Sequence, residues 1–67
     1  MTDVQSDIAE LELPYRRKAM LRRVDFESGM SMLRLVIREG TRITQVDLDS
    51  ETATELGNAL VGAAQDL

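Results

Sequence analysis

The chain has 67 residues, a formal net charge of −4, and no cysteine, histidine or tryptophan. A chain this short forms one small domain that buries only about 60% of its unfolded surface, so its stability as a monomer is marginal. Disulfides and a cysteine or histidine zinc site are excluded as supports, because their ligands are missing. Self-association is the remaining way to stabilise so small a fold.

Composition also indicates the cellular compartment in which we expect the protein. The N-terminal segment carries acidic residues and lacks the apolar core of a signal peptide, and no run is long enough to span a membrane. The absence of cysteine agrees with a reducing compartment. We therefore expect a cytoplasmic protein that has no membrane partner.

The charges are sorted along the chain. All eight lysines and arginines lie between Arg16 and Arg42, whereas most of the twelve acidic residues lie outside that interval. A basic middle between acidic flanks fits an anionic partner. It equally fits acidic flanks that pack against a basic sheet of the same or a neighbouring chain.

Residues 1–14 predict an N-terminal short helix or an extended arm, separate from a single domain over residues 15–67. Ser6 is a possible helix cap, with Val4 and Ile8 at helical spacing. In contrast, residues 10–13 alternate like a strand, and Pro14 disfavours a helical residue before it.

The next segment is a basic ribbon, which is a candidate for contact with an anion such as a nucleic-acid phosphate. Its candidate contact residues are Arg16, Arg17, Lys18 and Arg22. Tyr15 is the only aromatic residue beside them, whereas single-strand binders carry several stacking platforms, and the whole chain is acidic. A charged edge strand that resists unwanted pairing explains the same residues, so nucleic acid is possible but not favoured.

Residues 20–48 predict a three-stranded antiparallel β-meander. Ser28-Gly29 and Glu39-Gly40 supply the glycines that tight turns need, and we assign a two-residue loop to each. Alternation then gathers apolar side chains on one face. They are Met20, Val24, Phe26, Leu33, Leu35, Ile37, Val46 and Leu48.

The same register puts Leu21 opposite Val36, and Val36 opposite Ile43, on the other and mainly polar face. We interpret this aliphatic row as an oligomer interface ringed by charges. Its residues are Leu21, Val36, Ile43, Arg23 and Arg34.

Residues 51–65 predict a C-terminal amphipathic helix packed on one face of the sheet. Asp49 or Ser50 is a good N-cap. Gly57 and Gly62 each cost about 1 kcal/mol relative to alanine inside a helix, so we expect close backbone approach to compensate. The apolar stripe consists of Ala53, Leu56, Leu60, Ala63 and Leu67.

No motif points to catalysis. Carboxylate pairs such as Glu10 and Glu12 need a cleft, for which a domain of this size has little room. Oxygen ligands at Asp47, Asp49 and Glu51 are conceivable for a cation, but the spacing lacks the glycine of an EF-hand loop. We expect no enzyme, cofactor, metal or small-molecule substrate.

The block Met32 to Val61, MLRLVIREGTRITQVDLDSETATELGNALV, resembles a small bacterial family without assigned function. The resemblance rests on the Arg38-Glu39-Gly40 turn and on the Asp47-Leu48-Asp49 passage from strand to helix, and covers about the last two-thirds of the chain. It implies a similar fold and neither an activity nor site residues.

Together these patterns predict an α+β fold. The predicted function is a non-enzymatic interaction or assembly module that acts as a homo-oligomer. Nucleic-acid binding through the basic first strand is the alternative.

Overall fold

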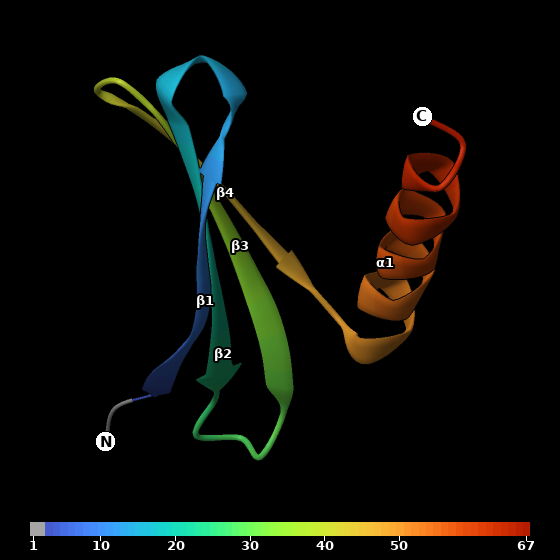
Figure 1. Cartoon of the computed structure of the whole chain (residues 1–67). Coiled ribbons are helices and arrows are strands. Elements are labelled where there is room, and N and C mark those ends of the chain that lie inside the picture. The colour runs from blue at the N-terminus through green and yellow to red at the C-terminus, as the bar shows by residue number, and fades with distance from the viewer. Residues whose placement is uncertain (1–2) are drawn as a thin grey trace.

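The computed structural model describes residues 3–67. In this range the chain forms four strands, one 3₁₀ turn and one α-helix. They are β1 (Val4–Leu13), η1 (Pro14–Arg16), β2 (Arg17–Asp25), β3 (Ser31–Glu39), β4 (Arg42–Leu48) and α1 (Ser50–Ala64). The strands pair in chain order as an antiparallel meander, and α1 follows β4 (Figure 1). The α+β class is confirmed, but the described sheet has four strands rather than the predicted three.

The additional strand is β1, which lies where we predicted a short helix or an arm. It pairs with β2 from Val4 opposite Asp25 to Leu13 opposite Arg17, with a bulge at Ile8. The extended conformation of residues 10–13 is confirmed, whereas a helix from Val4 onward is wrong. Residues 1–2 lie outside the described range. A helix of so few residues is costly to nucleate, whereas pairing along β2 satisfies the backbone N–H and C=O groups that face that strand.

The register between β2 and β3 differs by one residue from our prediction. Phe26 pairs with Met30, its N–H donating to the Met30 carbonyl at 2.8 Å, so the loop contains three residues rather than two. Gly29 takes the left-handed position of this loop at φ +94°, as is common in three-residue hairpins. A one-residue slip moves every β2 side chain to the other face.

The turn between β3 and β4 has two residues, as predicted, but they are Gly40 and Thr41. Glu39 therefore lies opposite Arg42, and Leu35 opposite Val46. The pairing shifts by two positions, which preserves the faces of both strands. The common face predicted for the apolar residues of β3 and β4 is thus confirmed, although their individual partners are not.

Alternation and register define two faces of the sheet. We call the face that carries Leu11, Leu21, Leu35 and Val46 the groove face, and the opposite face the charged face. Met20, Val24 and Phe26 lie on the charged face, because of the changed β2 register. Their predicted place beside Leu33 and Leu35 is wrong.

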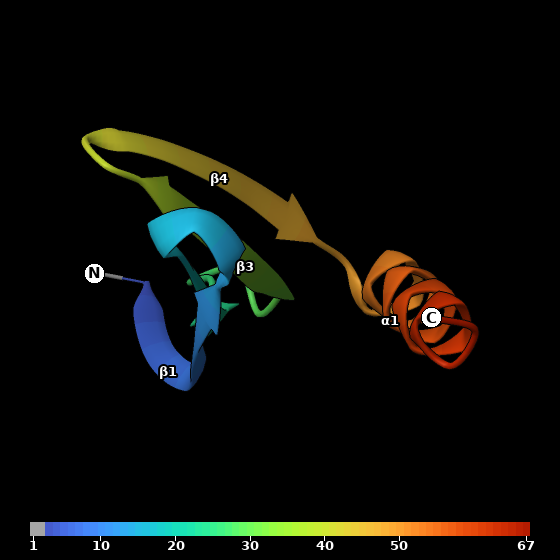
Figure 2. The same ribbon diagram turned by 45° about the horizontal axis from the view of Figure 1, so that its top comes forward.

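Helix α1 stands beside the sheet, with the wider separation toward its C-terminal end (Figures 1 and 2). Asp49 is its N-cap, and the Asp49 side chain accepts a hydrogen bond from the Thr52 N–H at 2.7 Å. Ala53 and Gly57 are half-buried, whereas Leu60 is 62% exposed. The predicted packing of the helix across one face is therefore only partial. In residues 3–67, no helix has the length and apolar character needed to cross a membrane.

The fold is open for its size. Among the described residues, the buried hydrophobic side chains are Ala19, Val24 and Val36. The radius of gyration is 13.5 Å, whereas a compact domain of this length has about 11 Å. Accessible surface amounts to 5536 Å², whereas a folded monomer of 7.5 kDa exposes about 4,200 Å². The chain thus leaves about 1,300 Å² uncovered that a typical monomer would bury.

Candidate functional site

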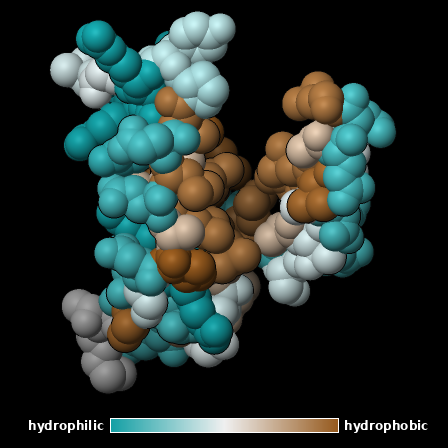
Figure 3. Space-filling view, in the orientation of Figure 1, coloured by the Kyte–Doolittle hydropathy of each residue, from teal (hydrophilic) through white to brown (hydrophobic). Residues whose placement is uncertain are grey.

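An apolar groove separates the groove face from α1. Strands β1, β2, β3 and the end of β4 form one wall, and the N-terminal and central turns of α1 form the other. The lining residues are Ala9, Leu11, Ala19, Met20, Leu21, Leu33, Leu35, Leu48, Ala53, Leu56, Gly57 and Leu60. No ionisable side chain is among them. Figure 3 shows this groove as an open notch with hydrophobic side chains on both walls.

The two walls do not close on each other. Leu11 on β1 remains 59% exposed, and Leu56 and Leu60 on α1 remain 41% and 62% exposed. The groove has a volume of about 220 Å³, which exceeds the roughly 150 Å³ of an engineered apolar cavity that admits benzene. It therefore has room for side chains of another molecule, and a contiguous apolar surface of this kind usually marks an interaction site.

The charged face carries a row of four ionic side chains, one from each strand. Asp7, Arg22, Arg34 and Asp47 lie opposite one another across the sheet. The two arginines face each other, an arrangement that destabilises a sheet unless the charges are compensated. The flanking acids compensate them: Arg34 Nε lies 2.8 Å from Asp47 Oδ1, and Arg22 Nε lies 3.0 Å from Asp7 Oδ1.

The two ion pairs of this row differ in geometry. Arg34 donates from Nε and from an Nη atom to both carboxylate oxygens of Asp47, at 2.8 and 3.0 Å. These hydrogen bonds lower the pKa of Asp47 and raise that of Arg34. Arg22 Nε is close to Asp7 but makes no hydrogen bond, because the donor is misaligned. The β3–β4 side of the row is therefore the better organised side.

Two other carboxylates also have a lowered pKa. Asp25 accepts a hydrogen bond from the Ser31 hydroxyl and a second from Arg23, which together lower its pKa. At the start of α1, the hydrogen bond from the Thr52 N–H is the main cause that lowers the pKa of Asp49, and the Thr52 side chain lowers it further. Hydrogen bonds that favour the charged form explain all of these directions.

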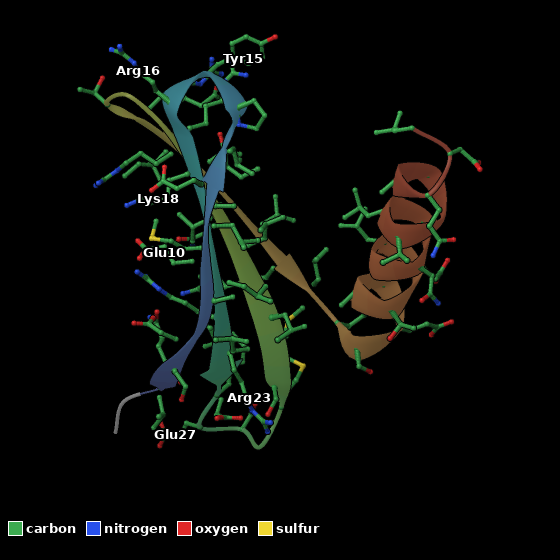
Figure 4. All side chains as sticks on the ribbon, in the orientation of Figure 1. Glu10, Tyr15, Arg16, Lys18, Arg23 and Glu27 are labelled. Carbon is green, nitrogen blue, oxygen red and sulfur yellow. The ribbon has the colours of Figure 1, made fainter. Side chains whose placement is uncertain are left out.

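The predicted anion contacts are mostly engaged within the chain. Arg17 lies 2.7 Å from Glu39, and Lys18 lies 3.4 Å from Glu10. Arg22 is beside Asp7, as described above. Arg16 makes no ion pair within residues 3–67. It extends with Tyr15 from the β1–β2 loop, whereas Lys18 and Glu10 lie next to each other on the strands below that loop (Figure 4). The four residues therefore do not form one free basic surface.

The β1–β2 loop has an unusual backbone. Tyr15 and Arg16 both have positive φ, 64° and 61°, a region that costs non-glycine residues energy. Arg17 lies over the Tyr15 ring at 5.9 Å from its centroid, a cation–π distance.

The predicted aliphatic row does not exist. Val36 lies opposite Met20 and Gln45, and Ile43 lies opposite Arg38. Leu21 lies opposite Leu35 on the groove face, because the three-residue loop reverses the side chains of β2. The geometric basis of the predicted interface is therefore wrong.

The two arginines of the predicted ring are also separated. The changed register of β2 places Arg23 on the groove face, where its Nε lies 2.9 Å from Asp25. Arg34 remains on the charged face and pairs with Asp47. No ring of arginines surrounds a common patch.

Sequence reasoning missed the groove. Its β1 wall, Ala9 and Leu11, fell within the segment predicted as a short helix or an extended arm, and Ala19 received no role. The alternation of Ala9, Leu11 and Leu13 is the signal that could have indicated a half-buried strand. Within residues 3–67, no group of three or more acidic, histidine or cysteine side chains is placed to hold a metal ion.

Comparison with protein families gives one match, over residues 2–66, to the model described as "Family of unknown function (DUF6967)". The chain belongs to the DUF6967 family. The predicted resemblance to a family without assigned function is thus confirmed. Comparison with curated proteins finds no match, and comparison with solved structures finds none. For this DUF6967 chain, function must therefore be inferred from the surfaces described above.

Proposed function

We propose that this DUF6967 chain is a non-enzymatic assembly module that acts as a homo-oligomer. The observation that carries the proposal is the accessible surface of 5536 Å². It exceeds the value for a typical monomer of this mass by about 1,300 Å². A standard protein–protein interface covers about 800 Å² of each partner. One self-association contact is therefore enough to account for most of the excess.

The lining of the groove favours a protein partner over a polar substrate. All of its lining residues are apolar, whereas sites for small substrates combine apolar walls with a few convergent polar groups. Apolar surface buried on association also supplies the stabilisation that so small a fold lacks.

We further propose that the protein is bacterial and that it is located in the cytoplasm. The resemblance described above motivates the bacterial origin. A chain without cysteine needs no oxidising compartment in order to fold, which is consistent with the cytoplasm.

Size-exclusion chromatography with light scattering tests self-association. We expect a mass of at least twice the 7.5 kDa of the chain, with dissociation on dilution. A mass of one chain at every concentration, up to the limit of solubility, would refute the proposal.

A further inference from the structure

We propose that the groove is occupied by α1 of a second copy, in a two-fold symmetric dimer in which each helix lies on the sheet of the other chain. This inference rests on the proposed self-association and names its surface. Three features of the chain support it: the junction before α1, the distribution of charge, and the area of the uncovered walls.

The junction holds α1 away from its own sheet. Asp49 alone separates β4 from α1, and its extended backbone has φ −77° and ψ 172°. Its side chain accepts a hydrogen bond from the Thr52 N–H, while its carbonyl accepts one from the Ala53 N–H at 2.9 Å. A capped junction of one residue, without glycine, leaves little freedom for the helix to rotate toward the groove face.

The charge distribution favours a helix on a sheet over a helix on a helix. Segment 3–48 carries eight basic and eight acidic residues, whereas segment 49–67 carries four acidic residues and no basic residue. A dimer in which the two copies of α1 met only each other would bring two acidic segments together, whereas a helix that also lies on the partner's sheet meets a segment without net charge.

The negative end of α1 also lacks a cation. The last turn has no basic residue, although a cation there stabilises a helix. Arg42 is on the groove face at the turn end of the sheet, and it has no ion pair within residues 3–67. The C-terminal end of α1 points toward that same end of the molecule (Figure 1). A helix exchanged in this direction would place its negative end near the Arg42 of the other chain.

The area agrees with such an exchange. The excess of about 1,300 Å² per chain exceeds the roughly 800 Å² per partner of a standard interface. Intertwined dimers bury more than that standard, and each chain here would contribute both a helix and a sheet face. The same interface would cover the open space at Gly57, where an added Cβ would meet no atom within 4 Å.

Single-cysteine variants provide the test, because the chain has no cysteine of its own. Leu11→Cys on β1 and Leu60→Cys on α1 are prepared separately, mixed, allowed to exchange and then oxidised. Helix exchange predicts a disulfide-linked heterodimer of one Leu11→Cys and one Leu60→Cys chain. The control is a mixture of Ile43→Cys and Leu60→Cys chains, which should not form this heterodimer. Ile43 is similarly exposed, at 55%, but lies on the charged face.

The double variant Leu11→Cys with Leu60→Cys separates exchange from closure within one chain. Exchange predicts covalent dimers, whereas a helix that folds onto its own sheet predicts a disulfide within a monomer, which would overturn the inference. Far-UV circular dichroism first confirms that each variant is folded. If Leu60→Cys does not fold, it is replaced by Leu56→Cys, which lines the same groove wall on α1.

A charge substitution gives an independent measurement. Leu60→Glu should raise the dissociation constant of the dimer by about 30-fold or more, the loss typical of a central interface residue, whereas Ile43→Glu should leave it unchanged. If both variants keep the dimer intact and the Leu11–Leu60 heterodimer fails to form, helix exchange is refuted while self-association stands. A monomeric wild-type chain would refute both proposals.

Discussion

Substitution of Val24 by alanine tests the buried side chains on the charged face. Val24 is 1% exposed and Val36 is 5% exposed, and the row of Arg22 and Arg34 lies between them on that face. The charged ends of these arginines reach Asp7 and Asp47, and arginine stems in general cover apolar neighbours in this way. Val24→Ala should therefore lower the free energy of unfolding as a core truncation does.

The expected loss is about 2 kcal/mol. Two methyl groups removed from a buried site cost about 0.8 kcal/mol each in transfer free energy, and incomplete closure of the resulting cavity adds to this loss. The total stability expected for 67 residues is only about 3 to 10 kcal/mol. A loss of this size should lower the melting temperature by roughly 8 to 16 °C.

Urea unfolding followed by far-UV circular dichroism is the suitable assay, since the chain has no tryptophan and Tyr15 is 87% exposed. All variants are compared at one protomer concentration, because association shifts apparent stability. Ile43→Ala, on the same face but 55% exposed, should change the free energy by less than about 0.5 kcal/mol. Equal losses for Val24→Ala and Ile43→Ala would refute the assignment of the buried side chains.

Three further predictions concern pH, turns and nucleic acid. The pKa of Asp47 is lowered in the fold, so its contribution to stability is present above about pH 4 and is lost as the pH falls through the lowered pKa. The melting temperature should therefore decrease on acidification, and it should decrease less for the Asp47→Asn variant. Gly40→Ala should lower the free energy of unfolding by about 1 kcal/mol, since Gly40 has φ +60°. Gly62→Ala, where an added Cβ meets open space on the helix, should raise the free energy of unfolding by about 1 kcal/mol. Urea titrations in which both variants change this free energy in the same direction would contradict the assigned conformations. Short DNA and RNA should show no tight, salt-sensitive binding by fluorescence anisotropy, because most cations of segment 16–22 are paired; strong binding at low salt would contradict this interpretation.

Two glycine turns and one helix could be predicted from the sequence for a clear physical reason. Gly29 and Gly40 both have positive φ, the conformation that glycine adopts without steric cost. Asp49 caps a helix that begins at Ser50, as the cap and the apolar stripe predicted. These features depend on local conformation, which the residues themselves strongly determine.

The register of β2 could not be predicted because both faces of that strand are partly apolar. Ala19 and Leu21 point to the groove face, and Met20 and Val24 point to the charged face. A three-residue loop turns Ala19 and Leu21 toward the helix, a two-residue loop would turn Met20 and Val24 toward it, and glycine suits both loops. The hydrophobic pattern therefore did not distinguish the two registers, and the aliphatic row predicted from the wrong register was wrong with it.

Strand β1 was missed for a related reason. The bulge between Asp7 and Ala9 places Val4 and Leu11 on the same face of the strand although they are seven residues apart, and a separation of seven also fits one face of a helix. A bulge adds one residue to a strand and shifts all later side chains relative to earlier ones. Without the position of β2, that shift resembles a helical repeat.

The two apolar faces of the sheet explain why stability and assembly are linked in this chain. On the charged face, Val24 and Val36 are buried on either side of an arginine row whose charges are compensated within the chain. The groove face is left uncovered, because its helix is held aside by a one-residue junction. Substitutions on the two faces should therefore separate two quantities: Val24→Ala lowers the stability of the fold itself, whereas Leu60→Glu, at a position already 62% exposed in the single chain, acts on association. Such a division is expected only if the uncovered apolar surface belongs to a contact between chains.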